Sequence, residues 1–290
     1  MQLSLTLGKR LLLFACVSLL CFIIAAVGVG VLTALGGASA KWLRIATVVQ
    51  DLLMFITPAV ITAVLVTRLP ARLLCIDSAP DMRLLLMAVV TMLVAIPAMN
   101  TVIAWNEGIE LPASMHGVEE WMRQSEDQAR AFMDVILGGD TVMALIVNIL
   151  IVGVLAGVSE EIFFRGGLQR LLTTGGVSAG LAVWLTAVIF SGVHMQFYGF
   201  VPRMLLGVYF GYALVWSRSL WLPIILHALN NSIYVCGLWL HGNADETPAL
   251  ATFTATDWLM AAVSAVATAA CLCIMYRMSH REAPAPGACR

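Results

Sequence analysis

The chain has 290 residues, of which 61% are hydrophobic and only 11% are charged, and its formal net charge is -1. Soluble domains carry about 25% charged residues, so this composition indicates a membrane protein. The balanced charge, without a basic cluster, excludes nucleic acid as a partner. The lipid bilayer is therefore the environment that the sequence predicts.

Eight apolar segments approach the length of about 20 residues that a helix needs to cross a bilayer. They cover residues 11–36, 45–67, 83–105, 141–172, 177–195, 201–217, 219–240 and 256–277. The sequence thus predicts an all-α polytopic membrane protein with about eight transmembrane helices. Pro58 and Pro97 lie within the second and third segments and are expected to kink them, because proline cannot donate a backbone hydrogen bond.

The distribution of Lys and Arg predicts the orientation of these helices. Most of the basic residues fall on one side if the N-terminus is cytoplasmic, in agreement with the positive-inside rule. An even number of spans then returns the C-terminus to the cytoplasm. The short loops, without a visible retention signal, favour a bacterial plasma membrane.

The one long polar segment lies between the third and fourth apolar segments. Apolar residues recur in it at helical spacing, which predicts an amphipathic helix over residues 118–137. We expect this helix to lie at the membrane interface. A lid over a functional site is the less favoured alternative.

The fourth apolar segment contains two carboxylates and a guanidinium, Glu160, Glu161 and Arg165. A charge at membrane depth costs about 2.5 to 3.5 kcal/mol on insertion scales, so such residues usually face the interior of a bundle and have a function. Glu161 and Arg165 are four residues apart, which places them on one helix face and predicts an ion pair.

Two histidines, His194 and His227, fall within the fifth and seventh apolar segments, and Asn231 shares a helix face with His227. A single histidine at membrane depth is more often a structural hydrogen-bonding group than a catalyst. Isolated polar groups cannot be satisfied in lipid, however, so these residues and the charged stretch are expected to form one buried polar cluster.

Such a cluster has the groups needed for hydrolysis. If Arg165 pairs with Glu161, Glu160 is free to act as a general base that takes a proton from water. A neighbouring histidine can orient that water or protonate the leaving amine. His227 and Asn231, on one helix face, are suited to stabilise an oxyanion.

The motifs Glu-Glu-x-x-x-Arg from Glu160, Phe-x-x-x-His from Phe190 and His-x-x-x-Asn from His227 occur in this order. In these motifs the chain resembles the CAAX protease and bacteriocin-processing (CPBP) family of intramembrane endopeptidases. The resemblance implies that Glu160 activates water with the help of His194 and that His227 and Asn231 stabilise the oxyanion. It also implies that three residues support the catalytic groups, namely Glu161, Arg165 and Phe190.

The resemblance leaves the question of a metal open. Members of the family have been described both as metalloproteases and as glutamate proteases without a metal. Glu160, His194 and His227 could bind zinc. The chain has no HExxH motif, and the two histidines lie on different predicted helices. We therefore favour chemistry without a metal or another cofactor.

The predicted activity is hydrolysis of a peptide bond in a membrane-associated or lipidated protein or peptide. Eukaryotic relatives process prenylated CAAX-box proteins, whereas bacterial relatives are linked to peptide processing or bacteriocin self-immunity, so the substrate stays open. The predicted organisation has three parts: helices one to three with the amphipathic helix in residues 1–138, the catalytic core in 139–240, and the last helix with a disordered tail in 241–290.

Two other functions are compatible with buried ionisable groups. A transporter or proton-coupled carrier could use the same Glu, His and Arg residues. Against it, the sequence shows no matching halves, and its buried polar residues are expected only in the second half of the chain. An inactive scaffold that binds a partner is the third alternative, and the intact Glu160, His194 and His227 disfavour it.

Overall fold

The computed structural model describes residues 5–37, 39–241 and 250–281, and this part of the chain contains helices and no strand. The predicted all-α class is therefore confirmed. The predicted disordered tail falls almost wholly on residues 282–290, which lie outside the described residues.

The first half of the chain forms three helical segments and an amphipathic helix. Helix α1 spans Leu7–Gly36, and a second continuous segment consists of α2 (Ala40–Asp51), the π-helix η1 (Leu52–Ile56) and α3 (Thr57–Val66). The short α4 (Pro70–Leu73) leads to α5 (Met82–Val94) and α6 (Ile96–Glu107). After a turn of η2 (Ala113–Met115), α7 covers His116–Leu137. The predicted amphipathic helix over 118–137 is thus present.

The second half begins with one long segment made of α8 (Val142–Asn148), the π-helix η3 (Ile149–Leu155), α9 (Ala156–Glu161), the π-helix η4 (Ile162–Gln169) and α10 (Arg170–Thr174). It continues with α11 (Ala179–Gly192), η5 (Phe197–Gly199) and α12 (Phe200–Ser217). Helix α13 (Trp221–His241), η7 (Leu250–Thr252) and α14 (Ala255–Arg281) complete the described chain.

All eight predicted apolar segments are helical, but their number does not establish eight spans. In the part of the chain that the structure describes, six helices are long and apolar enough to cross a membrane, and the pair α5 and α6, bent by 49°, would make a seventh. Helix α11 has 14 residues. At a rise of 1.5 Å per residue it is about 21 Å long, which is shorter than a hydrocarbon core of about 30 Å.

The two prolines act differently from each other. Pro97 lies in the first turn of α6, directly after the 49° bend at Ala95. The kink predicted in the third segment is therefore present. Pro58 lies in the first turn of α3, just after the wide turns of η1, within one continuous span.

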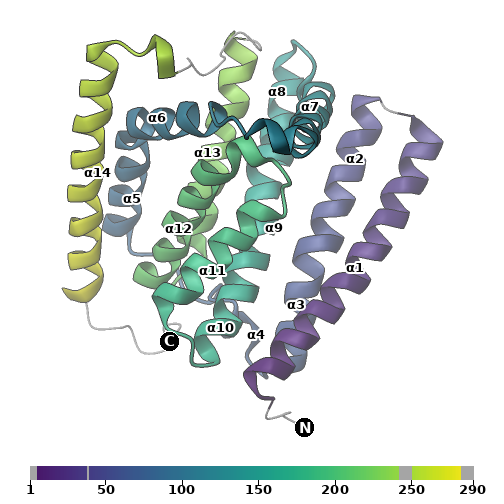
Figure 1. Ribbon diagram of the computed structural model, residues 1–290. Coiled ribbons are helices and arrows are strands. Elements are labelled where there is room, and N and C mark those ends of the chain that lie inside the picture. Colours follow the sequence, from purple (N-terminus) through teal and green to yellow (C-terminus); the bar gives the residue numbers. More distant parts are fainter. Residues whose placement is uncertain (1–4, 38, 242–249, 282–290) are drawn as a thin grey trace.

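The helices form a bundle in which the segment α8–α10 and helices α11 to α13 occupy the middle (Figure 1). Helices α1 to α3 flank them on one side, and α5 and α14 flank them on the other. Helices α6 and α7 cross the end of the bundle opposite the N-terminus.

Glycines bring the central helices close together. A Cβ atom on Gly157 would lie 2.9 Å from the backbone nitrogen of Ala228 on α13, and one on Gly207 would lie 3.1 Å from the Cβ of Ala187 on α11. The first contact is closer than a Cβ atom allows, so Gly157 is needed for this packing, and the second is tight enough that Ala187 would have to shift. Gly176 differs, because it lies in a turn with φ of 98° and a Cβ atom on it would meet no neighbour within 4 Å.

Candidate active site

The two adjacent carboxylates lie on α9, a short α-helical piece between two π-helical stretches. Glu160 and Glu161 are its last residues, and η4 begins directly after them. π-Helical turns are rare in proteins overall, but those that occur are frequently found at functional sites. The wider turn changes the direction in which the following side chains point. The backbone of this span is therefore irregular where the sequence places its charges.

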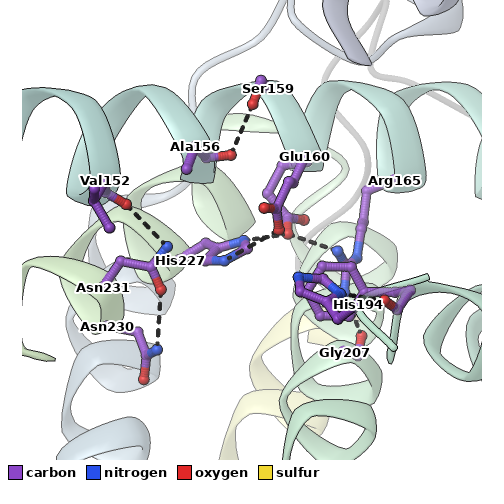
Figure 2. A network of polar contacts seen from close by, with 12 residues as sticks. Val152, Ala156, Ser159, Glu160, Arg165, His194, Gly207, His227, Asn230 and Asn231 are labelled. Atoms are coloured by element: carbon purple, nitrogen blue, oxygen red, sulfur yellow. Dashed lines mark hydrogen bonds and ion pairs between the residues drawn. The ribbon is translucent and has the colours of Figure 1, made fainter. Parts of the chain in front are cut away.

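Glu161 is the centre of a fully buried polar network. Its Oε1 accepts a hydrogen bond of 2.7 Å from Nη1 of Arg165 and one of 2.8 Å from Nδ1 of His227 (Figure 2). Nη2 of Arg165 donates to the carbonyl oxygen of Gly207 on α12 at 3.0 Å. The side chains of Glu161 and Arg165 have no exposed surface. The predicted ion pair is present, and it joins α9 and η4 to α12 and α13.

Aromatic rings enclose this network. The guanidinium carbon of Arg165 lies 4.5 Å from the ring centre of Phe190 and 5.6 Å from that of Phe210. The ring of Phe210 also stacks on His227 at 5.0 Å. Cation–π contacts gain strength when they are desolvated, as these are. Phe210 was not among the predicted supporting residues, because nothing in its local sequence marks it.

His227 lies between the two carboxylates. Its Nδ1 donates to Glu161, and its Nε2 lies 3.7 Å from Oε2 of Glu160. The side chain of Glu160 keeps 14% of its surface exposed, whereas that of Glu161 is closed off. The adjacent glutamates therefore differ: Glu161 is fixed by hydrogen bonds, and Glu160 is the carboxylate that water can reach.

His194 lies outside any helix, so its predicted place within a span is wrong. Helix α11 ends at Gly192, and the chain reverses through a turn in which Met195 has a φ of 55°. Nδ1 of His194 bonds to the carbonyl oxygen of Phe190 at 2.8 Å, and because a carbonyl only accepts, this nitrogen carries the proton. His194 still interacts electrostatically with Glu160 and His227.

Asn231 lies one helical turn after His227 on α13. Its Nδ2 donates to the carbonyl oxygen of Val152 on η3 at 3.3 Å, and its Oδ1 accepts from Nδ2 of Asn230 at 3.3 Å (Figure 2). These contacts tie Asn231 to η3 and not to the carboxylates. The structure thus links six of the seven predicted residues by contacts or charge and places Asn231 next to them.

Sequence reasoning missed Asp51, the last residue of α2. Its side chain is 4% exposed, its Oδ2 has no hydrogen-bond partner, and it interacts electrostatically with Glu160. The expectation that buried polar residues occur only in the second half of the chain is therefore wrong. The signal was visible, because Asp51 is the one acidic residue inside the apolar segment 45–67.

The predicted zinc ligands can be compared with this geometry. Within residues 5–37, 39–241 and 250–281, no three His, Cys, Asp or Glu side chains are grouped so that they could hold a metal ion. Nδ1 of His194 and Nδ1 of His227 are engaged by Phe190 and Glu161, respectively. Histidines that bind zinc commonly donate their other ring N–H to such a carbonyl or carboxylate oxygen, so these two bonds do not decide between zinc and no metal. The predicted chemistry without a metal stays a prediction.

A partly exposed carboxylate next to two imidazoles, inside a bundle of helices long enough to cross a membrane, is the arrangement expected of an intramembrane hydrolase. The comparison with known families agrees: the family model described as type II CAAX prenyl endopeptidase, Rce1-like, matches residues 142–233. This match confirms the predicted family, so the chain carries a protease segment of the Rce1-like family, inside the predicted core 139–240. The transporter alternative is not favoured. Neither the curated proteins nor the solved structures contain a match to the chain.

Proposed function

We propose that this protein is an intramembrane endopeptidase in which Glu160 activates water. The difference between the two adjacent glutamates supports this role most directly. Oε1 of Glu161 accepts hydrogen bonds from both Arg165 and His227 inside the closed core, whereas the side chain of Glu160 keeps 14% of its surface exposed. A general base must reach its water, and only Glu160 meets this condition.

The reaction follows from the proton positions of the two imidazoles. Glu160 removes a proton from water, and the resulting hydroxide attacks the carbonyl carbon of the scissile amide. His194 uses Nδ1–H for Phe190, so its bare Nε2 is available to orient the water or to relay the proton to the leaving amine. When the C–N bond breaks, this proton goes to the amine nitrogen, and Glu160 returns to its ionised form.

His227 is the proposed donor to the oxyanion. Because Nδ1–H already donates to Glu161, the ring offers a second N–H only when it is doubly protonated. Asn231 is the second proposed donor. One N–H of its side-chain amide donates to the carbonyl oxygen of Val152, and the other N–H is available for the oxyanion. Arg165 and Phe190 keep Glu161 in place.

The proposed reaction needs no metal or other cofactor, and its substrate is a membrane-associated or lipidated peptide. The matched family processes prenylated CAAX proteins by its description, so a prenylated peptide is the first substrate to test. As a second proposal, the same hydrolysis of a peptide bond serves bacteriocin self-immunity. We also propose a bacterial plasma membrane location with cytoplasmic termini, which the charge distribution of the loops supports.

The test uses the purified full-length chain in liposomes with a peptide that ends in a prenylated cysteine followed by three residues. The same peptide without the prenyl group is the second substrate. We expect wild-type protein to cleave and Glu160→Gln to lose activity by about 10²- to 10⁴-fold, the usual contribution of a general base. Glu120→Gln, a change of the same kind on the exposed surface of α7, is the matched control.

Cleavage by Glu160→Gln at the wild-type rate, with a normal unfolding temperature, would overturn the mechanism. A chelator is added in a parallel assay. Undiminished cleavage supports the reaction without a metal, and loss of activity that zinc restores contradicts it.

A further inference from the structure

The loop that carries His194 is held from outside the bundle. It runs from Val193 to Gly199, between α11 and α12, and its last three residues form η5, where the candidate span Phe197–Ser217 begins. A side chain on a loop is only as well placed as the contacts that fix the loop. The groups that hold this segment therefore decide where His194 stands relative to Glu160.

The amphipathic helix α7 provides the first of these groups. Oε1 of Glu126 accepts a hydrogen bond of 2.9 Å from the backbone N–H of Tyr198, and its Oε2 accepts one of 3.4 Å from the side chain of Gln196. The two bonded residues lie two and four positions after His194. Trp121 on the same helix packs its ring against Phe197 at 5.0 Å.

Neighbouring elements fix the same loop from other directions. Asn106, at the end of α6, donates to the carbonyl oxygen of Phe197 at 3.1 Å and accepts from the N–H of Val201 at 2.7 Å. Arg203 on α12 donates to the side-chain oxygen of Gln196 at 2.8 Å. Arg203 also interacts electrostatically with both Glu126 and Glu160.

The far end of α7 is fixed as well. Nε of Arg44 on α2 donates to the carbonyl oxygen of Ile136 at 2.9 Å, and its Nη2 donates to that of Gly138 at 2.8 Å. A helix that only lay on lipid would need neither these bonds nor those of Glu126. Helix α7 is therefore docked on the His194 loop through its middle, at Glu126, and on α2 through its C-terminal end.

We propose that Glu126 is a positioning residue for catalysis, which acts through the Val193–Gly199 loop to set His194 opposite Glu160. This inference rests on the proposed role of His194 in the site. It assigns a function to α7 that an interfacial helix does not have: the helix is a clamp on half of the site. Glu126 itself touches no reacting atom.

The experiment compares three variants of the full-length protein. Glu126→Ala removes both acceptors, Glu126→Gln keeps one acceptor for the N–H of Tyr198, and Asp127→Asn changes the exposed neighbouring acid of the same helix. The kinetic measurement is cleavage of the prenylated peptide in liposomes. The structural measurement is amide hydrogen exchange of the peptide that contains residues 193–199.

For Glu126→Ala we expect kcat to fall on the order of 10- to 100-fold with KM within about twofold, because a small displacement of a catalytic group costs that much. Exchange in the 193–199 peptide should accelerate, while exchange in α9 and α13 stays as in wild type. Glu126→Gln should recover part of both quantities, and Asp127→Asn should match wild type.

Unchanged exchange of the loop in Glu126→Ala, or faster exchange with an unchanged kcat, would overturn the proposal. Equal acceleration of exchange in α9 and α13 would also overturn it, since Glu126 would then support the whole bundle. If wild-type protein cleaves no peptide, the proposed function fails, and the exchange measurement still decides whether Glu126 holds the loop.

Discussion

The two halves of the site are built in different ways. The half around Glu161 is assembled by buried side chains on packed helices, with Arg165 and His227 both bonded to one carboxylate oxygen. The half around His194 stands on a loop, which Glu126 and Asn106 hold from the end of the bundle. Stability and catalysis are therefore separable in this site. The half around Glu161 is part of the packed core, whereas the half around His194 lies on a loop that is bound to the end of the bundle.

The largest expected difference between the halves is in stability, and Arg165→Met tests it. The change leaves Glu161 as a buried charge with only His227 beside it, and breaking a buried ion pair from one side costs about 3 to 5 kcal/mol. Thermal unfolding of the detergent-solubilised protein measures this loss. The double variant Arg165→Met with Glu161→Leu should recover a large part of it while remaining inactive. A stable single variant would show that the network does not support the fold.

The two histidines give the next contrast. His227→Ala removes a hydrogen bond to buried Glu161, so we expect it to lower stability by about 1 to 3 kcal/mol as well as to remove activity. His194→Ala removes only a ring on a loop, so activity should fall by about 10²- to 10⁴-fold with little change in the unfolding temperature. Equal destabilisation by the two variants would contradict the separation of the halves.

The smallest expected effect comes from the packing of α9 against α13, which assembles the half of the site around Glu161. In Gly157→Ala the new Cβ would lie 2.9 Å from the backbone nitrogen of Ala228, so α9 and α13 must move apart. Overpacking of this kind costs about 1 to 3 kcal/mol, and here it also moves the glutamates away from His227. Gly237→Ala on α13 meets no atom within 4 Å and is the matched control. Unfolding temperatures and kcat of both variants measure the effect.

The first half of the site is also the half that the sequence predicts better. Apolar runs identify the helices, and a spacing of four residues pairs Glu161 with Arg165, because both signals depend on one helix alone. The gathering of His227 with the glutamates follows from the cost of isolated polar groups in lipid. The contact between His227 and Glu161 did not follow, because pairing across helices depends on their rotation about their axes.

The second half depends on contacts between distant segments. Glu126 and Tyr198 are 72 positions apart, and no periodicity connects them. The end of α11 before His194 was also missed, since the apolar run continues through Val193 and Met195 although the backbone has already turned. Asp51 was not predicted for a simpler reason: the apolar run around it predicts a span by its length alone, and a single acidic residue does not change that prediction.

The π-helical stretches on both sides of α9 constrain how this span can change. Each contains wider turns than an α-helix, as if a residue had been added to a regular helix. Loss of one residue from η4 would let the chain relax into the more regular helix, and the guanidinium of Arg165 would rotate away from Glu161. A deletion in this span is therefore expected to disturb the site more than most substitutions do, because it changes the helical register of every side chain that follows it.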